Sequence, residues 1–134
     1  MTSTPCPAAR NVSTTVLNVR TTPFICGCQA SVASNSFTSE LAKANTVCFD
    51  TETTGTEPVK AELIGIAFSY RKFEAYYIPI PEDKKAAEKI LEALKPVFEH
   101  EGIKKIGQNI KYDIIVLANA GIAVKGKIFD TMLA

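Results

Sequence analysis

The sequence lacks a strong net charge, a long apolar run and a leader of the secretory type. Its 15 Lys and Arg against 14 Asp and Glu leave a net charge of +1, so the total charge does not indicate a nucleic-acid or membrane partner. No run of about 18 apolar residues is present, and no basic region precedes a short apolar stretch at the start. The sequence therefore predicts a soluble protein that is not secreted by the usual route. Its 134 residues suffice for one domain with an apolar core, or for a piece of a larger protein.

Acidic residues are missing from the first 39 positions, which hold two Arg and thirteen Ser or Thr. With Pro5, Pro7 and Pro23 and little periodic apolar content, residues 1–37 are predicted to be disordered or loosely packed. The folded region, residues 38–134, would then begin with a short helix. An acid-free, Ser-rich start that bears Arg is also typical of organellar transit peptides, although a plain tail or linker has the same composition.

Cysteine and histidine are too scarce and too scattered to indicate a zinc site. Cys26 and Cys28 form a C-x-C pair, but no second pair follows, and the single histidine, His100, lies far along the chain. We therefore expect reduced thiols in an intracellular protein, with Cys48 as a small apolar residue of the core.

Three stretches rich in β-branched and aromatic residues predict strands over 46–52, 62–70 and 75–80. Turn residues separate them, and Gly65 inside the second marks a bulge or the close approach of another group. Because the connections are short, the three strands are expected to form an antiparallel meander.

After Pro81 the apolar period changes from two to 3.6, which predicts helices between further strands. Asn109 and Gly121 are typical of the cap and the stop of the second of these helices. A helix before the fourth strand favours a strand parallel to the first. The predicted elements are a helix over 82–102, a strand over 103–108, a helix over 109–121 and a strand through Ile128 and Phe129. Together these elements predict an α/β fold with a mixed sheet.

The first candidate for chemistry is FDTETTG, residues 49–55, where Asp50 and Glu52 are two positions apart in a strand. Such residues point to the same face, and two neighbouring carboxylates oppose each other's ionisation unless a cation lies between them. Hard ions such as Mg²⁺ or Mn²⁺ prefer carboxylate oxygens. Two hydrated acids on an exposed face are the alternative.

The second candidate is NIKYD, residues 109–113. With Asn109 as the cap, Asp113 lies one turn into a helix that starts where a strand beside the first one ends. This geometry can bring a third carboxylate toward Asp50 and Glu52, at the strand ends where ligands of open α/β sheets gather. Alternatively, Asp113 interacts with the helix dipole and Lys111 is a solvated surface charge.

The segments FDTETTG, AELIGIAFS, YYIPI, KIGQNIKYDIIVL and FDTML, in this order, closely resemble the 3′–5′ proofreading exonuclease domain of bacterial DNA polymerase I (family A). That domain belongs to the DEDD exonucleases, which share a ribonuclease-H-like fold. The resemblance covers about residues 46–134 and does not extend to 1–37. It implies a ribonuclease-H-like mixed sheet, with a three-stranded antiparallel meander, parallel strands and flanking helices, incomplete at the C-terminus.

The resemblance also implies hydrolysis of phosphodiesters at DNA 3′ ends with two ions, Mg²⁺ or Mn²⁺. Asp50 would bridge the ions, Glu52 would bind one and orient the attacking water, and Asp113 would hold the second ion directly or through water. Tyr112 would more readily pack or line the cleft than hold the strand. The residues expected at the substrate are Thr51, Thr56, Gln108, Asn109 and Tyr112.

The sequence departs from the family pattern in two respects. Thr56 stands where relatives often carry a bulky apolar residue that wedges between terminal bases. No Tyr-x-x-x-Asp segment follows FDTML within the 134 residues; of the four tyrosines only Tyr70 has an acid four positions later, Glu74, which lies in a turn. For Asp130 we expect a structural role. We therefore expect the N-terminal part of an exonuclease domain that binds metal weakly and is nearly inactive alone.

Two alternatives stay open at this stage, a ribonuclease D-like exoribonuclease and a non-catalytic nucleic-acid module that keeps the fold. The expected partners are single-stranded DNA 3′ ends and a downstream polymerase domain of the parent chain, with no membrane. The expected location is the bacterial cytoplasm, or an organelle if residues 1–37 are a transit peptide.

Overall fold

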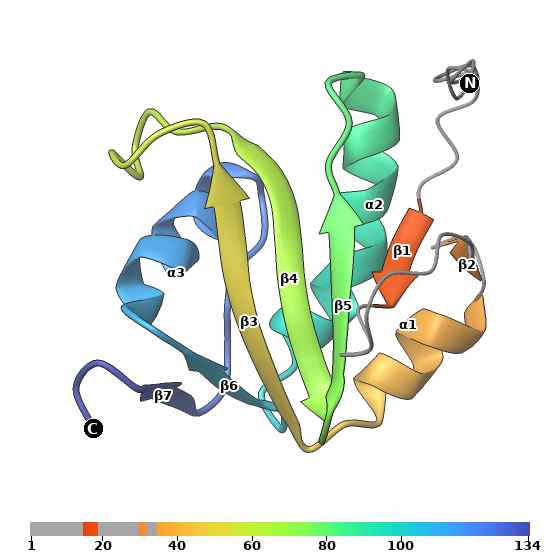
Figure 1. The fold of residues 1–134 in the computed structure, drawn as a ribbon, viewed down its shortest axis with the longest axis vertical. Helices are drawn as coiled ribbons and strands as arrows, with labels where there is room; N and C mark the ends of the chain where they lie inside the picture. Colours follow the sequence, from red (N-terminus) through yellow and green to blue (C-terminus); the bar gives the residue numbers. More distant parts are fainter. Residues whose placement is uncertain (1–14, 19–29, 32–34) are drawn as a thin grey trace, which may run out of the picture.

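The computed structural model describes residues 15–18, 30–31 and 35–134 (Figure 1). No helix within these ranges is long and apolar enough to cross a membrane. The elements are β1 (Thr15–Asn18), β2 (Ala30–Ser31), α1 (Asn35–Ala42), β3 (Thr46–Thr53), β4 (Leu63–Arg71), β5 (Glu74–Pro79), α2 (Lys84–Phe98), β6 (Lys104–Gly107), α3 (Ile110–Asn119) and β7 (Ile128–Asp130).

The described strands form one sheet in the order β2-β1-β5-β4-β3-β6-β7. β4 is antiparallel to both β3 and β5, whereas β6 runs parallel to β3 and β7 runs parallel to β6. The predicted meander and the predicted parallel strands are both confirmed. β3 is therefore the strand at which the sheet changes from antiparallel to parallel pairing, as Figure 1 shows.

β3 buries one of its faces and exposes the other. Val47, Phe49 and Thr51 are buried, and between them Cys48 and Asp50 are exposed. The ring of Phe49 packs edge-on against Phe98 of α2, with 5.0 Å between centroids. Because Thr51 contacts α3 from this same face, both helices cover the side of β3 that carries Phe49 and Thr51.

This arrangement corrects the prediction for Cys48, which is exposed and not part of the core. The alternation of a strand puts Cys48 on the same face as the acids at positions 50 and 52. α2 and α3 lie against the other face of β3, so Cys48 stays accessible.

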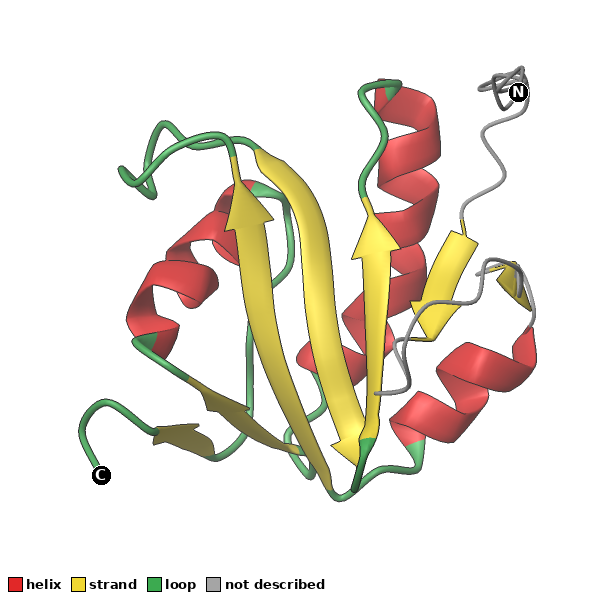
Figure 2. Cartoon of the chain, in the orientation of Figure 1, coloured by secondary structure: helices red, strands yellow, loops and turns green. Residues whose placement is uncertain are grey.

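α2 lets the chain cross back behind the sheet so that β6 can pair parallel with β3 (Figure 2). Its apolar stripe is buried as predicted, and the Asp83 side chain caps it by accepting the N–H of Ala86 at 2.9 Å. The helix is shorter than the predicted 82–102, because Asp83 occupies the cap position and the chain turns at Glu99 toward β6. The buried residues of the stripe are Ile90, Leu94, Val97 and Phe98.

Gly65 and Gly121 fulfil their predicted roles. A Cβ at Gly65 would lie 2.0 Å from the hydroxyl oxygen of Tyr77, so the tyrosine ring needs a glycine beneath it. Gly121 has φ of 84° just after α3, and Ile122 beyond it donates its N–H to the carbonyl of Leu117, which closes the helix end.

Within residues 1–37 the structure describes two short strands and the start of α1. β1 pairs with β2 on one side and with β5 on the other, both antiparallel. The prediction that residues 1–37 are disordered or loosely packed stays a prediction, and pairing of β1 and β2 through backbone groups needs no apolar period. The rest of the prediction for 1–37, including the transit-peptide alternative, lies outside the described residues.

Candidate active site

The candidate site lies where β3 loses its neighbour on one side. β6 pairs with β3 only at Thr46, Val47 and Cys48, so the edge of the next residues of β3 faces the start of α3. Asp50 and Glu52 are exposed in this unpaired part and, as alternate residues of one strand, share a face. The loop of residues 54–62, which leads to β4, leaves from the same end of β3 (Figure 2).

Asp113 of α3 contacts β3 where β3 has no β6 partner. The side chain is 2% exposed, and its Oδ1 accepts the Thr51 N–H at 2.8 Å and the Thr51 hydroxyl at 2.6 Å. The Thr51 N–H, which has no partner on β6, is thus bound by the Asp113 carboxylate of α3. Of the three predicted carboxylates, Asp113 is therefore buried and held, whereas Asp50 and Glu52 are open to solvent.

The ionisation of Asp113 depends on these surroundings. Burial raises the pKa of Asp113 above its ordinary value of 3.8, and the negative charge of Asp50 raises the pKa further. The two hydrogen bonds from Thr51 act in the opposite direction, because they stabilise the carboxylate. Thr51 lies between Asp50 and Glu52 in the sequence, so Asp113 is bound to β3 between the two exposed acids.

The donor chemistry at this end of β3 fits a hard divalent cation. Carboxylate oxygens are the ligands that Mg²⁺ and Mn²⁺ prefer, and Asp50 and Glu52 present theirs to solvent from one face. Among the residues that the structure describes, no group of three or more His, Cys, Asp and Glu side chains is arranged to hold a metal ion. Asp113 is therefore a neighbour of the exposed pair, held by Thr51, and does not join the pair in a ready-made cluster.

Tyr112 fastens the loop that follows the two acids. Its hydroxyl donates to the carbonyl of Gly55 at 2.5 Å and lies 2.7 Å from Oγ1 of Thr53. Thr56, next in the loop, is exposed. The Tyr112 hydroxyl thus holds the loop, Thr56 is accessible, and the predicted place of both residues at the substrate stays a prediction.

Asn109 occupies the cap position of α3 but does not act as the cap. Its backbone is left-handed, with φ of 53° and ψ of 43°, and its side chain makes no capping hydrogen bond. Instead, Asp130 of β7 accepts the backbone N–H of Asn109 at 2.9 Å and of Ile110 at 3.2 Å. The predicted capping by Asn109 is therefore wrong, and the expected structural role of Asp130 is confirmed.

Sequence reasoning missed both the Asp130 cap and the bond from Thr51 to Asp113. Asp130 lies about twenty positions beyond the helix that it caps, so no local pattern reveals it. One signal was available: parallel neighbours such as β6 and β7 end at the same edge. An acid at the end of β7 therefore lies beside the helix that follows β6.

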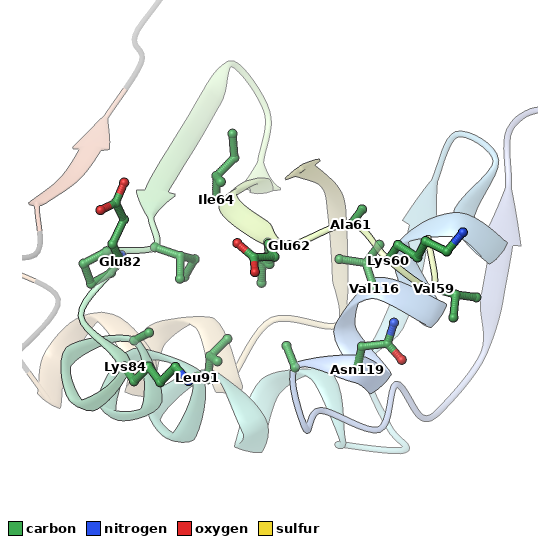
Figure 3. A pocket seen from close by; sticks show the side chains of 15 residues that line it. Val59, Lys60, Ala61, Glu62, Ile64, Glu82, Lys84, Leu91, Val116 and Asn119 are labelled. Atoms are coloured by element: carbon green, nitrogen blue, oxygen red, sulfur yellow. The ribbon is translucent and has the colours of Figure 1, made fainter. Parts of the chain in front are cut away.

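A separate pocket of about 450 Å³ lies between the start of β4, the start of α2 and the end of α3 (Figure 3). Its wall is largely apolar, with Leu91 and Val116, and Lys60 and Glu62 are among the polar residues that line it. None of the predicted site residues lines it. We therefore place the candidate site at the end of β3 and not in this pocket.

Residues 27–134 match the family described as 3′–5′ exonuclease. DNA polymerase I of Pseudomonas aeruginosa is 40% identical over 110 residues, which cover 74% of this chain and 12% of that protein. The chain thus spans only a small part of the curated relatives that it matches.

Solved structures give the same fold. Brucella melitensis NrnC with bound Mg²⁺ has a TM-score of 0.55 at 26% identity, over 69% of this chain and 44% of that one. Escherichia coli RNase D, described as an exoribonuclease involved in structured RNA processing, has a TM-score of 0.54 at 18% identity, over 72% and 24% respectively. The latter shows likeness of fold alone. These neighbours are ribonuclease-H-like exonucleases, so the predicted fold class is confirmed.

Proposed function

The chain belongs to the 3′–5′ exonuclease family of DNA polymerase I, and on this premise we propose that it contributes to hydrolysis of phosphodiester bonds at DNA 3′ ends. The observation that carries the proposal is the pair Asp50 and Glu52, exposed on one face where β3 loses its neighbour, with Asp113 hydrogen-bonded to Thr51 between them. Because both carboxylates are exposed to solvent and are not buried among apolar side chains, their oxygens are accessible to a cation.

We assign the three carboxylates to divalent ions, Mg²⁺ or Mn²⁺. Asp50 and Glu52 offer exposed oxygens to them, and Asp113 offers a carboxylate whose orientation Thr51 fixes through two hydrogen bonds. When bound, such ions supply positive charge at the scissile phosphate and make water a better nucleophile. Glu52, which is nearer than Asp50 to the C-terminal end of β3, is suited to orient the attacking water.

The substrate strand would lie along the end of β3 and the start of α3. Asn109 and Thr56 are exposed there, and the Gln108 side chain, also exposed, is hydrogen-bonded to Thr131. Tyr112 supports the loop beneath the strand through Gly55. Because the hydroxyl and amide of Thr51 are used by Asp113, we give Thr51 a positioning role and not a contact with DNA.

A single-stranded 3′ end is the substrate that we favour, since unpaired bases can splay out and stack on apolar or aromatic groups. The relatives are DNA polymerase I proteins, so we propose proofreading beside a polymerase domain, in the bacterial cytoplasm. Within the 134 residues no Tyr-x-x-x-Asp segment supplies a fourth carboxylate. We therefore expect weak metal binding and little hydrolysis by this chain alone.

Ribonuclease activity is the second candidate, because the fold alone does not distinguish DNA from RNA as the substrate. The sugar 2′-hydroxyl would decide between the two. A matched pair of oligonucleotides, deoxyribo and ribo, separates them directly: tighter binding and faster trimming of the ribo strand would favour the second candidate.

Metal binding is the first test. We expect Mn²⁺ to raise the melting temperature of the unaltered chain, since a ligand that binds only the native state stabilises it. Asp50→Ala and Glu52→Ala should lose that rise, whereas Glu88→Ala, at an exposed acid on α2, should keep it. An unaltered chain that shows no rise with Mn²⁺ would indicate a non-catalytic module.

Hydrolysis is the second test, on a single strand labelled near its 5′ end with Mg²⁺ or Mn²⁺. We expect slow shortening from the 3′ end, abolished by Asp50→Ala. Fast shortening that Asp50→Ala abolishes would support the assignment of the site and refute the expectation of weak activity. Shortening that survives Asp50→Ala would refute the assignment of the site.

A further inference from the structure

The turn before α3 is held by the end of β7. Asp130 Oδ1 accepts the Asn109 N–H at 2.9 Å and the Met132 N–H at 2.9 Å, and Oδ2 accepts the Ile110 N–H at 3.2 Å. Thr131 donates its N–H to the carbonyl of Gly107 at 2.9 Å. We refer to Asp130 and Thr131 together as the β7 clamp.

The β7 clamp, and not the Asn109 side chain, caps the N-terminus of α3. An Asn at the cap of a helix normally uses its own side-chain oxygen to accept an N–H of the first turn, but here the Asp130 carboxylate does so. The charge of Asp130 is also favourable at a helix N-terminus. The Asn109 side chain makes no cap bond and is exposed, so its amide, which can both donate and accept, is available to a ligand.

The backbone of Asn109 fixes where that amide points. Asn is among the few residues other than Gly that adopt a left-handed backbone at small cost, and Asn109 does so with φ of 53°. Its neighbour differs, because the Gln108 side chain is bound to the hydroxyl of Thr131. The β7 clamp therefore binds the side-chain amide of Gln108 and leaves the side-chain amide of Asn109 exposed.

We propose that Asp130 is a positioning residue of the nucleic-acid site, which fixes Asn109 so that its side-chain amide binds the substrate strand. This inference rests on the proposed function. Asp130 does not touch the substrate.

The test measures binding of a 5′-labelled oligothymidylate by fluorescence anisotropy, with Ca²⁺ in place of Mg²⁺ to keep the strand intact. Asp130→Asn keeps the size of the side chain but removes its charge and one acceptor. We expect it to weaken binding by roughly tenfold, as a lost cap of this kind would. Asn109→Ala should weaken binding about equally, and the double variant should bind no worse than Asn109→Ala.

Asp83→Asn is the matched control, because Asp83 caps α2 by the same chemistry away from the site. It should lower the stability of the chain and leave binding unchanged. Equal weakening by Asp83→Asn, strictly additive losses in the double variant, or full binding by Asp130→Asn would each overturn the proposal.

Amide hydrogen exchange separates this inference from the proposed function. The N–H groups of Asn109 and Ile110 should be protected in the unaltered chain and lose protection in Asp130→Asn. If the unaltered chain does not bind the oligonucleotide, the proposed function fails and the inference falls with it. If it binds but the two amides exchange freely, the proposed function stands and the role of Asp130 is refuted.

Discussion

Thr51→Val is the substitution that examines the end of β3 most directly. Valine has nearly the shape of threonine, so the change removes the hydroxyl that donates to Asp113 at 2.6 Å and leaves the backbone N–H bond at 2.8 Å in place. Packing changes little, because Thr51 is 8% exposed and the new methyl fills the space of the hydroxyl. The measured effect is therefore that of one hydrogen bond to a buried carboxyl.

The expected loss is about 2 kcal/mol in the free energy of unfolding at neutral pH, within the range for hydrogen bonds to charged groups. Total stabilities of domains are only about 5–15 kcal/mol, so the loss is easily resolved by urea unfolding. Thr51→Ser, which keeps a hydroxyl, is the control and should lose clearly less.

The loss should depend on pH in a defined direction. The pKa of Asp113 is raised above 3.8, chiefly by burial, so folding favours its protonated form. Its contribution to stability is thus greatest below 3.8 and declines as pH rises through the folded-state pKa. The Thr51 hydroxyl opposes that rise in pKa, so its removal should raise the pKa further. The cost of Thr51→Val should therefore be largest at neutral pH and shrink in mild acid.

The assay is urea unfolding in buffer with a chelator, for Thr51→Val, Asp113→Asn and the double variant, at neutral and mildly acidic pH. Most of the loss should vanish in the Asp113→Asn background, since the partner charge is then gone. An equal loss at both pH values, or a loss that persists in full in the double variant, would refute the claim that the Thr51 hydroxyl stabilises an ionised Asp113.

Three further predictions concern neighbouring groups. Gly65→Ala should destabilise the chain by about 1–3 kcal/mol, because its Cβ would lie 2.0 Å from the Tyr77 hydroxyl oxygen; a companion Tyr77→Ala change should recover part of this loss in urea unfolding, and no recovery would contradict the steric cause. Asp50→Asn should lower the pKa of Asp113 in a carboxyl NMR titration without metal, since the charge of Asp50 raises that pKa; an unchanged titration would mean that the groups do not interact. Tyr112→Phe should cost about 1 kcal/mol and speed proteolysis in residues 54–61, because the bond to the Gly55 carbonyl is lost; unchanged cleavage would show that the loop is held by other contacts.

The sequence was sufficient for those features that depend on period and on chain neighbours. Alternation along β3 put Asp50 and Glu52 on one face, and the structure exposes both. The change of period after Pro81 located α2 and its buried stripe. Gly65 was expected to allow a close approach, and the Tyr77 ring provides it.

Features that depend on which elements meet were not predictable in this way. Period two shows that Cys48 and Phe49 face opposite ways, but not which of them a helix will cover. The cap of α3 comes from Asp130, about twenty residues later in the sequence, and not from Asn109. The orientation of Asp113 depends on an unpaired amide of Thr51, which exists only because β6 stops pairing at Cys48.

The bonds between Thr51 and Asp113 bear on how an inactive form of this domain should be made. The Asp113 carboxylate does for β3 what a neighbouring strand does elsewhere in the sheet, since it accepts a backbone N–H of β3. A substitution at Asp113 would therefore remove a candidate metal ligand and also a hydrogen bond that holds β3, the strand of Asp50 and Glu52. The two effects on activity could not be told apart. Asp50→Ala, at a side chain that is exposed to solvent, is the cleaner reagent for trapping a nucleic acid on an intact fold.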